Sequence, residues 1–482
     1  MQKDKRKLVF SIMKALLVVI SLGCMGIFTY FLLRLNIIPI KFLIVGFFAL
    51  FFLFLLFFSG LYSKRKKVLK VISILFILLF SVSFLYGTKY LINTYNFFEN
   101  VTQQEYETLR YSVLVLQDEN YEKLDDLQGK SISYLENEYQ EEVKNELRNI
   151  SYTEVLNTEF GSVLDYLLER TTDAIVLEES YVAIAEEEIE DFSSKVKTIY
   201  SFDVRIKAHV ENEEAKDITI TMSPFILYIS GIDQWGSVSS VRGRSDVNQL
   251  VVVNPKTNHI LLVNTPRDYY VQLAGTTGLK DKLTHAGIYG IDKSIETLEN
   301  LYDIDITHYL RVNFDTVIQV VDVIGGIDIN SDKAFQAYTN RNVYVEKGWN
   351  HFGGAQALAY ARERYAYTTG DHHRGANQQQ VITAILDKVT KSNVLISKYN
   401  SILNTLNGSF QTDMSMNEIT SFIKYQLDKM PLWKIDSIAV TGSGSMDYTY
   451  SMGSKYKLYV MEPNMSSVET AKAKMNEVLN EG

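Results

Sequence analysis

Three long apolar segments near the N-terminus limit what this chain can fold into. Ala15–Leu33, Phe42–Ser63 and Val71–Thr88 are uncharged for 19, 22 and 18 residues. A helix needs about 20 apolar residues to cross the hydrocarbon core of a bilayer. The sequence therefore predicts three transmembrane helices, at about residues 10–33, 42–63 and 71–93, in a membrane region of residues 1–96. A signal peptide followed by a buried hairpin is disfavoured, because no short apolar segment ends in a small-residue cleavage site.

The distribution of charge predicts how the helices are oriented. Residues 1–96 carry 13 Lys or Arg and one acidic residue, whereas residues 97–482 carry 35 basic and 56 acidic residues. The basic residues gather before the first helix and between the second and third. Because such segments stay in the cytoplasm, we expect a multi-pass protein of the cell membrane with a cytoplasmic N-terminus and an extracellular C-terminal domain. The acidic exported part argues against nucleic acid as a partner, and the orientation argues against cytosolic ATP as a substrate. The single cysteine, Cys24, lies in the first membrane helix, so the exported part has no disulfides.

Residues 97–215 alternate between strand-like and helix-like patterns, which predicts a small α/β accessory domain. We expect strands at 111–116 and 173–177, and helices at 135–148, at 162–170 and from the second strand to about 194. The acidic residues are spread over the helix faces and are interpreted as solvated surface. A charged stretch at 211–216 marks the expected boundary.

Residues 217–482 predict a larger α/β domain with a central sheet flanked by helices. Apolar runs at 225–232, 249–253 and 259–263 predict strands, and NPKTN between the last two predicts a hairpin. Helical spacing appears at 286–301, 314–324 and 378–389. Gly325 and Gly326 end one helix before a strand at 327–330. The end of 403–430 predicts a helix, 433–440 a strand and 466–482 a final helix. The fold class is thus a membrane-anchored α/β protein with three N-terminal transmembrane helices, an accessory domain and a catalytic domain.

Polar groups follow or precede the predicted strands of this larger domain. Asp233 follows the strand FILYISGI, Asp246 ends the motif GRSD before the next strand, and Arg267 lies in PRD after the third. The hairpin places the start of one strand beside the end of its neighbour, so we expect Asp246 and Arg267 to lie close together. Ligands in open α/β sheets often bind at strand ends.

The stretch 349–382 adds further arginines to this candidate site. Arg362, Arg364 and Arg374 fall within thirteen residues, around a polar loop between two helical patterns. The planar guanidinium group makes paired hydrogen bonds to phosphate oxygens. Carboxylates beside them suggest a hard cation, because Mg²⁺ binds one or two carboxylates together with substrate phosphates. The adjacent His372 and His373 suggest a transition-metal site less well, because no third ligand is evident.

At these residues the chain resembles the LytR-CpsA-Psr family, and among them the capsule-linked members with three membrane helices and an accessory domain. The matching motifs are GRSD (243–246), PRD (266–268), KLTHAGIYG (282–290), GGIDI (325–329) and GAQALAYARER…GDHHRGANQQQ. The resemblance implies Asp233 and Asp246 as ligands of Mg²⁺ or Mn²⁺. It implies a pyrophosphate site made of Arg244, Arg267, Arg362, Arg364, Arg374 and Gln378, of which Arg267, Arg362 and Arg374, with Asp246, are the expected catalytic residues. Two positions depart from the family pattern: Asn377 stands where Arg is frequent, and His351 replaces a small or polar residue.

The resemblance also implies an activity. Family members in Gram-positive bacteria transfer a glycopolymer from a polyprenyl-pyrophosphate carrier to peptidoglycan. For this chain it implies a phosphotransferase for capsular polysaccharide or a related polymer, with the carrier-linked polysaccharide, peptidoglycan, the membrane and capsule export or regulatory proteins as partners. Asp246, Asp268 and Asp371 are candidates for the general base. Two alternatives stay open: a non-enzymatic membrane regulator of capsule biosynthesis, and a polyprenyl-pyrophosphate phosphatase with water as the nucleophile.

Overall fold

The structure is a computed structural model that describes residues 2–63, 67–102, 106–207, 220–232, 242–367, 370–392, 394–406 and 408–482. The chain divides into two compact units. The first contains the residues up to 102 and Met414–Leu432, and the second contains most of the remainder. The expected boundary at 211–216 lies outside the described residues.

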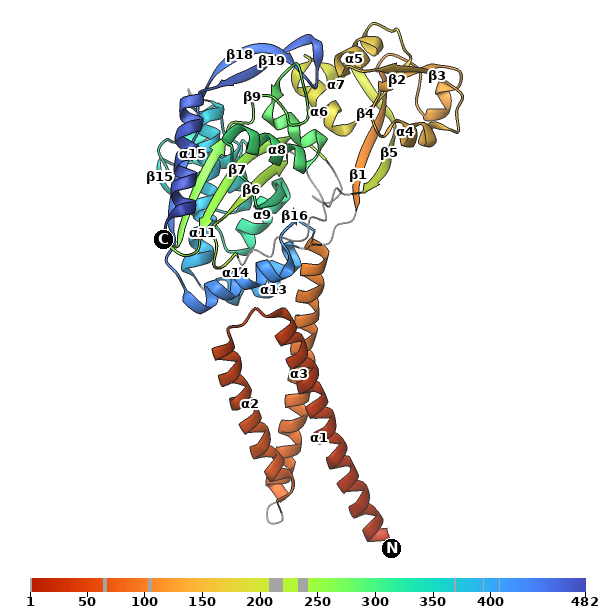
Figure 1. Cartoon of the computed structure of the whole chain (residues 1–482). Helices are drawn as coiled ribbons and strands as arrows, with labels where there is room; N and C mark the ends of the chain where they lie inside the picture. Colours follow the sequence, from red (N-terminus) through yellow and green to blue (C-terminus); the bar gives the residue numbers. More distant parts are fainter. Residues whose placement is uncertain are drawn as a thin grey trace. The chain divides into compact units, whose positions relative to one another are not determined.

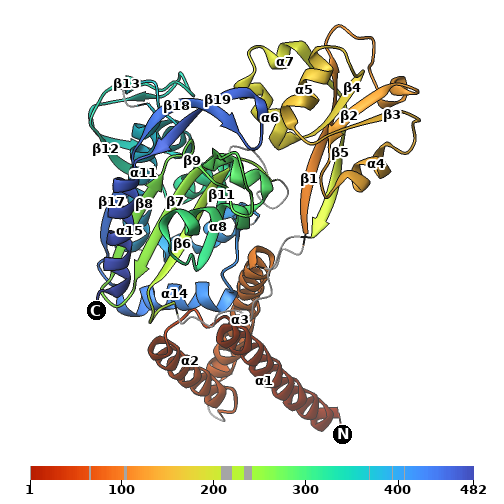
Figure 2. The same ribbon diagram turned by 45° about the horizontal axis from the view of Figure 1, so that its top comes forward.

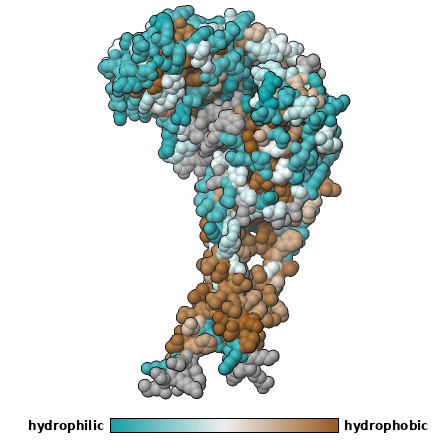
Figure 3. All heavy atoms as spheres, turned by 180° about the vertical axis from the view of Figure 1, so that it is seen from behind, coloured by the Kyte–Doolittle hydropathy of each residue, from teal (hydrophilic) through white to brown (hydrophobic). Residues whose placement is uncertain are grey.

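The first unit holds the apolar helices and one helix from far along the chain. They are α1 (Gln2–Leu35), α2 (Ile40–Leu61), α3 (Lys67–Thr102) and α14 (Met416–Lys429). By length and composition α1, α2 and α3 can each cross a membrane, which confirms the three predicted helices, and hydrophobic side chains cover them (Figure 3). α14 lies against the loop between α1 and α2, where Asp428 pairs with Lys41 at 2.8 Å and Lys424 donates to Asn36 at 2.8 Å.

The accessory domain is built on a five-stranded sheet of order β3-β2-β4-β1-β5 (Figure 1). Alternate residues of a strand face opposite sides, so Val113 and Val115 of β1 pack against α4, while Leu114 and Leu116 share a core with α5 and α6. The strands are β1 (Tyr106–Leu116), β2 (Ser131–Leu135), β3 (Thr153–Asn157), β4 (Ala174–Glu178) and β5 (Val196–Lys207). The helices are η1 (Leu124–Leu127), α4 (Gln140–Leu147), α5 (Phe160–Leu168), α6 (Glu179–Glu188) and α7 (Phe192–Lys195).

Two expected helices of this domain are wrong in extent. Residue 135 belongs to β2, where Ile132 and Tyr134 alternate with polar residues in the period of a strand, and the helix covers only Gln140–Leu147. The helix expected to reach 194 ends at Glu188. The backbone then turns through Asp191 at φ 58° before α7, a left-handed conformation that Asp tolerates better than most residues.

A six-stranded sheet of order β16-β11-β6-β7-β8-β17 forms the centre of the C-terminal domain. Its strands are β6 (Phe225–Ile232), β7 (Ser245–Asn254), β8 (His259–Thr265), β11 (His308–Asn313), β16 (Phe410–Thr412) and β17 (Lys434–Ala439). β7 pairs antiparallel with β6 and β8, which confirms the expected hairpin. Shorter strands are β9 (Tyr270–Val271), β10 (Asp281–Lys282), β12 (Ile327–Ser331), β13 (Phe335–Gln336), β14 (Tyr344–Val345) and β15 (Gly348–Phe352).

Helices cover both faces of this sheet, as predicted (Figure 2). On one face, α8 (Ile291–Tyr302) and α15 (Met465–Asn480) pack on alternate residues of β6, β7 and β8. On the other lies α11 (Asp371–Lys391), whose Gln379 donates to the carbonyl groups of Leu262 and Ile438 at 3.3 and 2.8 Å. The remaining helices are η3 (Leu283–Tyr289), α9 (Phe314–Val323), α10 (Gly354–Ala361), α12 (Val394–Ser397) and α13 (Tyr399–Leu406).

Two details of the C-terminal domain differ from expectation. The helix expected from 286 begins as the 3₁₀ helix η3, and α8 starts only after Gly290, which has φ 114°. The helix expected at the end of 403–430 is confirmed as α14, and α13, a turn at Gly408 of φ 76° and β16 precede it. A hairpin of β18 (Gly442–Thr449) and β19 (Gly453–Pro463) was not expected, because its first strand is rich in Gly and Ser.

Apolar contacts and ion pairs join the accessory domain to the C-terminal domain. Ile288, Met452 and Leu458 share the core formed by α5, α6 and α7. Beyond that core, Glu107 of β1 pairs with Arg242 at 2.8 Å and lies 3.8 Å from Arg311, and these three side chains are at most 11% exposed. At this and the other described ion pairs across the join, the accessory domain supplies the acid and the C-terminal domain the base.

Candidate functional site

Asp246 and Arg267 meet at one end of the central sheet, as the hairpin predicts. Asp246 is the second residue of β7, and Arg267 follows the end of β8. Nη1 of Arg267 lies 3.0 Å from both carboxylate oxygens of Asp246, and the Thr284 hydroxyl donates to the same carboxylate at 3.0 Å. Below them, Ser245 is fixed by a buried hydrogen bond with Ser230 at 2.6 Å. The site is thus held by residues whose own positions are fixed by the sheet.

Two glycines allow neighbouring elements to approach this sheet end closely. A Cβ at Gly287 of η3 would lie 2.5 Å from the carbonyl oxygen of Gly243. A Cβ at Gly375 of α11 would lie 2.2 Å from the side-chain amide of Asn264 at the end of β8. Both distances are shorter than any real Cβ contact, so only glycine fits without displacement. The motifs KLTHAGIYG and GDHHRGANQQQ therefore bring η3 and the first turns of α11 against the strand ends.

The electrostatics show that three arginines act on Asp246. Burial opposes its charge, but the guanidinium groups of Arg267, Arg244 and Arg374 outweigh burial and hold the pKa of Asp246 well below its usual range. Arg374 is 9% exposed and belongs to the first turn of α11. The carboxylate is therefore ionised at neutral pH. The structure brings together four of the predicted residues from three separate motifs.

Asp268 and Lys282 extend this cluster. The Asp268 carboxylate lies 3.8 Å from Nε of Arg267 and 3.8 Å from Nζ of Lys282, and the three side chains are at most 8% exposed. Lys282 lies in a motif that was recognised, yet its role was not predicted. An ammonium group beside guanidinium groups adds to the positive potential at the strand ends.

Two more predicted arginines contact aromatic rings. Arg362, which follows α10, lies over the ring of Phe314 at 3.9 Å. Arg364 donates to the Tyr365 hydroxyl at 3.0 Å. Gln378 lies one turn after Arg374 on α11, so the two share a face of that helix. Their role in binding phosphate stays a prediction.

Asp233 lies outside the described residues, as does the side chain of Asp371. Among the described residues, no three His, Cys, Asp or Glu side chains are grouped as a metal site. Asp246 nevertheless fits a hard cation, because it is an ionised oxygen ligand beside a cluster that suits phosphate. The predicted pair Asp233 and Asp246 therefore stays a prediction for Mg²⁺ or Mn²⁺.

The residues that departed from the family pattern have structural roles. Asn377 is fully buried and donates to the Tyr360 carbonyl at 3.1 Å, so it holds α11 to α10. His351 pairs with Asp328 at 2.7 Å on the two-stranded sheet of β12 and β15. His373, considered as a metal ligand, stacks on Tyr367 with the ring centroids 3.3 Å apart.

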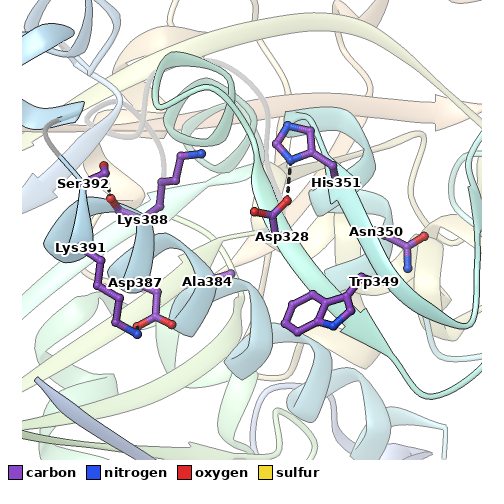
Figure 4. Close-up of a pocket in the computed structure, with 9 residues that line it drawn as sticks. All are labelled: Asp328, Trp349, Asn350, His351, Ala384, Asp387, Lys388, Lys391 and Ser392. Carbon is purple, nitrogen blue, oxygen red and sulfur yellow. Dashed lines mark hydrogen bonds and ion pairs between the residues drawn. The ribbon is translucent and has the colours of Figure 1, made fainter.

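A groove of about 660 Å³ lies apart from the arginines, between β15 and the last turns of α11 (Figure 4). Trp349 is 75% exposed there, and no predicted site residue lines the groove. Its lining residues are Asp328, Trp349, Asn350, His351, Ala384, Asp387, Lys388, Lys391 and Ser392.

Sequence reasoning missed two acidic residues that reach the site from the accessory domain. Glu187 of α6 pairs with Nη2 of Arg267 at 2.6 Å and also with Arg244. Glu188 pairs with Lys282. Burial opposes the charge of Glu187, but Arg267, Arg244 and Lys282 outweigh burial and the nearby Asp246, and its pKa falls to about 2. The one signal in the sequence was the run of three glutamates at 186–188, which we had interpreted as solvated surface.

Comparison with known proteins now identifies the domain that carries this site. The LytR_cpsA_psr family model matches residues 193–474. The chain belongs to the LytR-CpsA-Psr family. The match contains every predicted site residue but starts after Glu187 and Glu188, which therefore lie outside the residues that the family model matches.

Relatives of this chain have similar sequences over about half of its length. The chain is 29% identical over 286 residues to the polyisoprenyl-teichoic acid–peptidoglycan teichoic acid transferase TagV of Bacillus subtilis (strain 168), covering 58% of this chain and 71% of that protein. It is 31% identical over 240 residues to the transferase TagU of the same description from Enterococcus faecalis, covering 49% and 77%. The crystal structure of B. subtilis TagV aligns with a TM-score of 0.44 and 31% identity, covering 54% of this chain and 98% of that one.

Proposed function

We propose that this protein is a phosphotransferase that moves a glycopolymer from a polyisoprenyl-pyrophosphate carrier to peptidoglycan. The observation that carries this proposal is the cationic cluster of Arg244, Arg267, Lys282 and Arg374 at the strand ends of the LytR-CpsA-Psr domain. The described activities of TagV and TagU, which act between a polyisoprenyl-linked polymer and peptidoglycan, support it. The polymer is a capsular polysaccharide or a related anionic or neutral glycan.

The reaction takes place on the outer face of the membrane. Basic residues in the first turns of α1 and around the loop between α2 and α3 favour a cytoplasmic location for those ends, which places the loop between α1 and α2 outside. Lys41, which follows that loop, pairs with Asp428 of α14, and α14 lies within the residues that the family model matches. On this orientation a carrier in the same membrane would present its polymer on the side where peptidoglycan is present.

The arginines bind the two phosphates of the carrier and stabilise the charge that develops on them. A sugar hydroxyl of peptidoglycan attacks the phosphorus on the polymer side. A new oxygen–phosphorus bond forms as the bond to the lipid phosphate breaks, and the lipid monophosphate leaves. The hydroxyl proton passes to a carboxylate, for which Asp246, Asp268 and Asp371 are the candidates. Asp246 and Asp233 would hold Mg²⁺ or Mn²⁺, whose chemistry when bound is to neutralise phosphate charge.

Arg374→Ala tests this function directly. Loss of one preorganised cation should lower the amount of polymer attached to purified wall by about 100-fold, at a normal protein level. Arg341→Ala is the matched control, because Arg341 is an exposed arginine of the same domain, and it should leave attachment unchanged. Unchanged attachment in Arg374→Ala would remove the assignment.

The product of the purified protein separates the alternatives. With a labelled lipid-linked substrate and peptidoglycan, a transferase yields polymer on peptidoglycan. A phosphatase, which would use the same arginines with water as the nucleophile, splits the diphosphate and releases lipid monophosphate and polymer phosphate with nothing attached to peptidoglycan. A regulator of capsule biosynthesis yields neither product.

A further inference from the structure

The end of α6 has an arrangement of charge that is unfavourable for a helix by itself. Glu186, Glu187 and Glu188 form its last three residues, and no basic residue lies in that turn. The C-terminus of a helix carries a partial negative charge, so acidic residues there are repelled by the helix and by one another. Sequences break such local rules mainly at functional sites. An interaction elsewhere must therefore offset the repulsion.

That interaction is with the cationic cluster. Glu187 spans Arg267 and Arg244, and Glu188 reaches Lys282. These are the groups that would hold the carrier's phosphates in the proposed function. Oε1 of Glu187 accepts from Arg267 and Oε2 accepts from Arg244, so one carboxylate bridges two guanidinium groups. Two oxygens of one phosphate can bridge two arginines in the same way, because phosphate also accepts charge-assisted hydrogen bonds from guanidinium groups.

The charges match as well as the geometry. Within the described part of this cluster, the LytR-CpsA-Psr domain supplies the cations Arg244, Arg267, Lys282 and Arg374 and the carboxylates Asp246 and Asp268. These six described side chains together carry two more positive than negative charges. Glu187 and Glu188 supply two negative charges, and a diphosphate diester carries one on each phosphate. The acidic pair and the carrier's diphosphate are equivalent in charge.

Solvent access differs between the two partners of this contact. The Arg267 side chain is 7% exposed, whereas that of Glu187 is 31% exposed. The guanidinium group is fixed in the sheet end, and the carboxylate approaches it from a side that water also reaches. An incoming anion can therefore replace Glu187 without unfolding either domain.

We propose that Glu187, with Glu188 beside it, is an internal competitor for the phosphate site and so a specificity-determining residue of the proposed reaction. The accessory domain holds the site with two carboxylates, and only a ligand that offers both charges together displaces them. Singly charged anions replace one contact and leave the other. This inference rests on the proposed function, and it gives the accessory domain a role at the site.

The test is the binding of inorganic pyrophosphate to the purified full-length chain, measured by isothermal titration calorimetry without divalent cations. If Glu187 occupies the arginines in most molecules, only the remaining fraction can bind pyrophosphate, and the apparent affinity falls by that fraction. Glu187→Gln should therefore bind pyrophosphate about tenfold more tightly than the unmodified chain. Glu187→Asp, which keeps the charge but reaches less far, should lie between them. Glu186→Gln is the matched control, since Glu186 is the preceding residue of α6 and accepts a hydrogen bond from Ser193 instead.

A purely structural role for Glu187 predicts a different result. Under the proposed role, Glu187→Gln lowers the melting temperature measured without ligand and tightens pyrophosphate binding. If Glu187 had only a structural role, the same change would lower the melting temperature and weaken pyrophosphate binding. Unchanged or weaker binding in Glu187→Gln overturns the inference.

Arg374→Ala separates this failure from failure of the proposed function. If Arg374→Ala loses pyrophosphate binding and Glu187→Gln matches the unmodified chain, only the role of Glu187 is wrong. If Arg374→Ala binds as well as the unmodified chain, or if no form binds, the phosphate site itself is wrong.

Discussion

Two ionic clusters join the accessory domain to the LytR-CpsA-Psr domain, and they differ mainly in their access to water. Glu107 lies among Arg242 and Arg311 with every side chain at most 11% exposed. Glu187 contacts Arg267 while 31% exposed. A buried charge that loses its partner stays uncompensated, whereas water can replace a partner near the surface. The same pairing of residue types therefore makes a permanent join in one place and an exchangeable contact in the other.

The largest effect is expected at the buried cluster. Glu107→Ala should destabilise the protein by about 3–5 kcal/mol, because two buried guanidinium groups lose their shared carboxylate. Denaturant unfolding of the purified chain measures this change. Glu141→Ala serves as the control, since that side chain is 76% exposed and its loss should have little effect. A loss at Glu107 as small as that at Glu141 would remove the distinction between the clusters.

Glu178, next to the buried cluster, should make stability depend on pH. Burial raises the pKa of Glu178 from 4.5 to about 7, and the nearby carboxylate of Glu107 adds to the rise. The hydrogen bond with Ser180 and the charge of Arg242 oppose it. The folded state thus holds the proton more tightly, and the stability this provides is present below pH 4.5 and lost as pH rises through 7. Glu178→Gln should therefore melt about 3 °C or more above the unmodified chain at pH 8. At pH 4 the two should agree, and an equal difference at pH 4 and pH 8 would contradict the assignment.

Glu187 should show the opposite dependence and a smaller effect. Its pKa is lowered from 4.5 to about 2, despite burial, by Arg267, Arg244 and Lys282, with Asp246 opposing. Its contribution is therefore present above pH 4.5 and lost as pH falls towards 2. Glu187→Gln should cost on the order of 1 kcal/mol at pH 7. Melting curves from pH 7 to 3 should show the difference from the unmodified chain shrinking, and a growing difference would contradict this sign.

The smallest effect is expected at a third pair across the same join. Lys455 lies 2.5 Å from Asp165 but is 45% exposed, and Asp165 also accepts a hydrogen bond from Tyr456. Lys455→Ala should leave the melting temperature within about 1 °C of the unmodified value. A larger loss would show that exposure does not determine the strength of these contacts.

Features that depend on local pattern could be predicted from the sequence. The membrane helices follow from the length of three apolar runs. The contact between Asp246 and Arg267 follows from one hairpin, because antiparallel neighbours place the start of one strand beside the end of the other. Arg374 is assigned to the same site from the cluster of arginines in 349–382 and from the family motif, whereas its position depends on the close approach of Gly375 to Asn264, which no local pattern shows.

Features that depend on contacts between distant segments could not be predicted in this way. Glu187 lies 80 residues before Arg267, and an acidic run at a helix end has the same appearance whether water or an arginine faces it. The charged residues that follow residue 135 favour a helix, so the sequence predicts a helix that begins at this residue. The hairpin of β18 and β19 has too few apolar residues in its first strand to show a strand period.

The contact between Glu187 and the arginines has a further consequence, because both belong to one chain. A tethered group acts at an effective concentration set by its linkage, which for short links reaches the millimolar range. Anions in dilute solution do not reach that concentration, so in the proposed role Glu187 keeps them out of the site. A lipid carrier diffuses in the same membrane as the three helices, and its confinement to that surface raises its own local concentration. The protein can therefore select a rare lipid-bound diphosphate by its confinement to the membrane surface as well as by its charge.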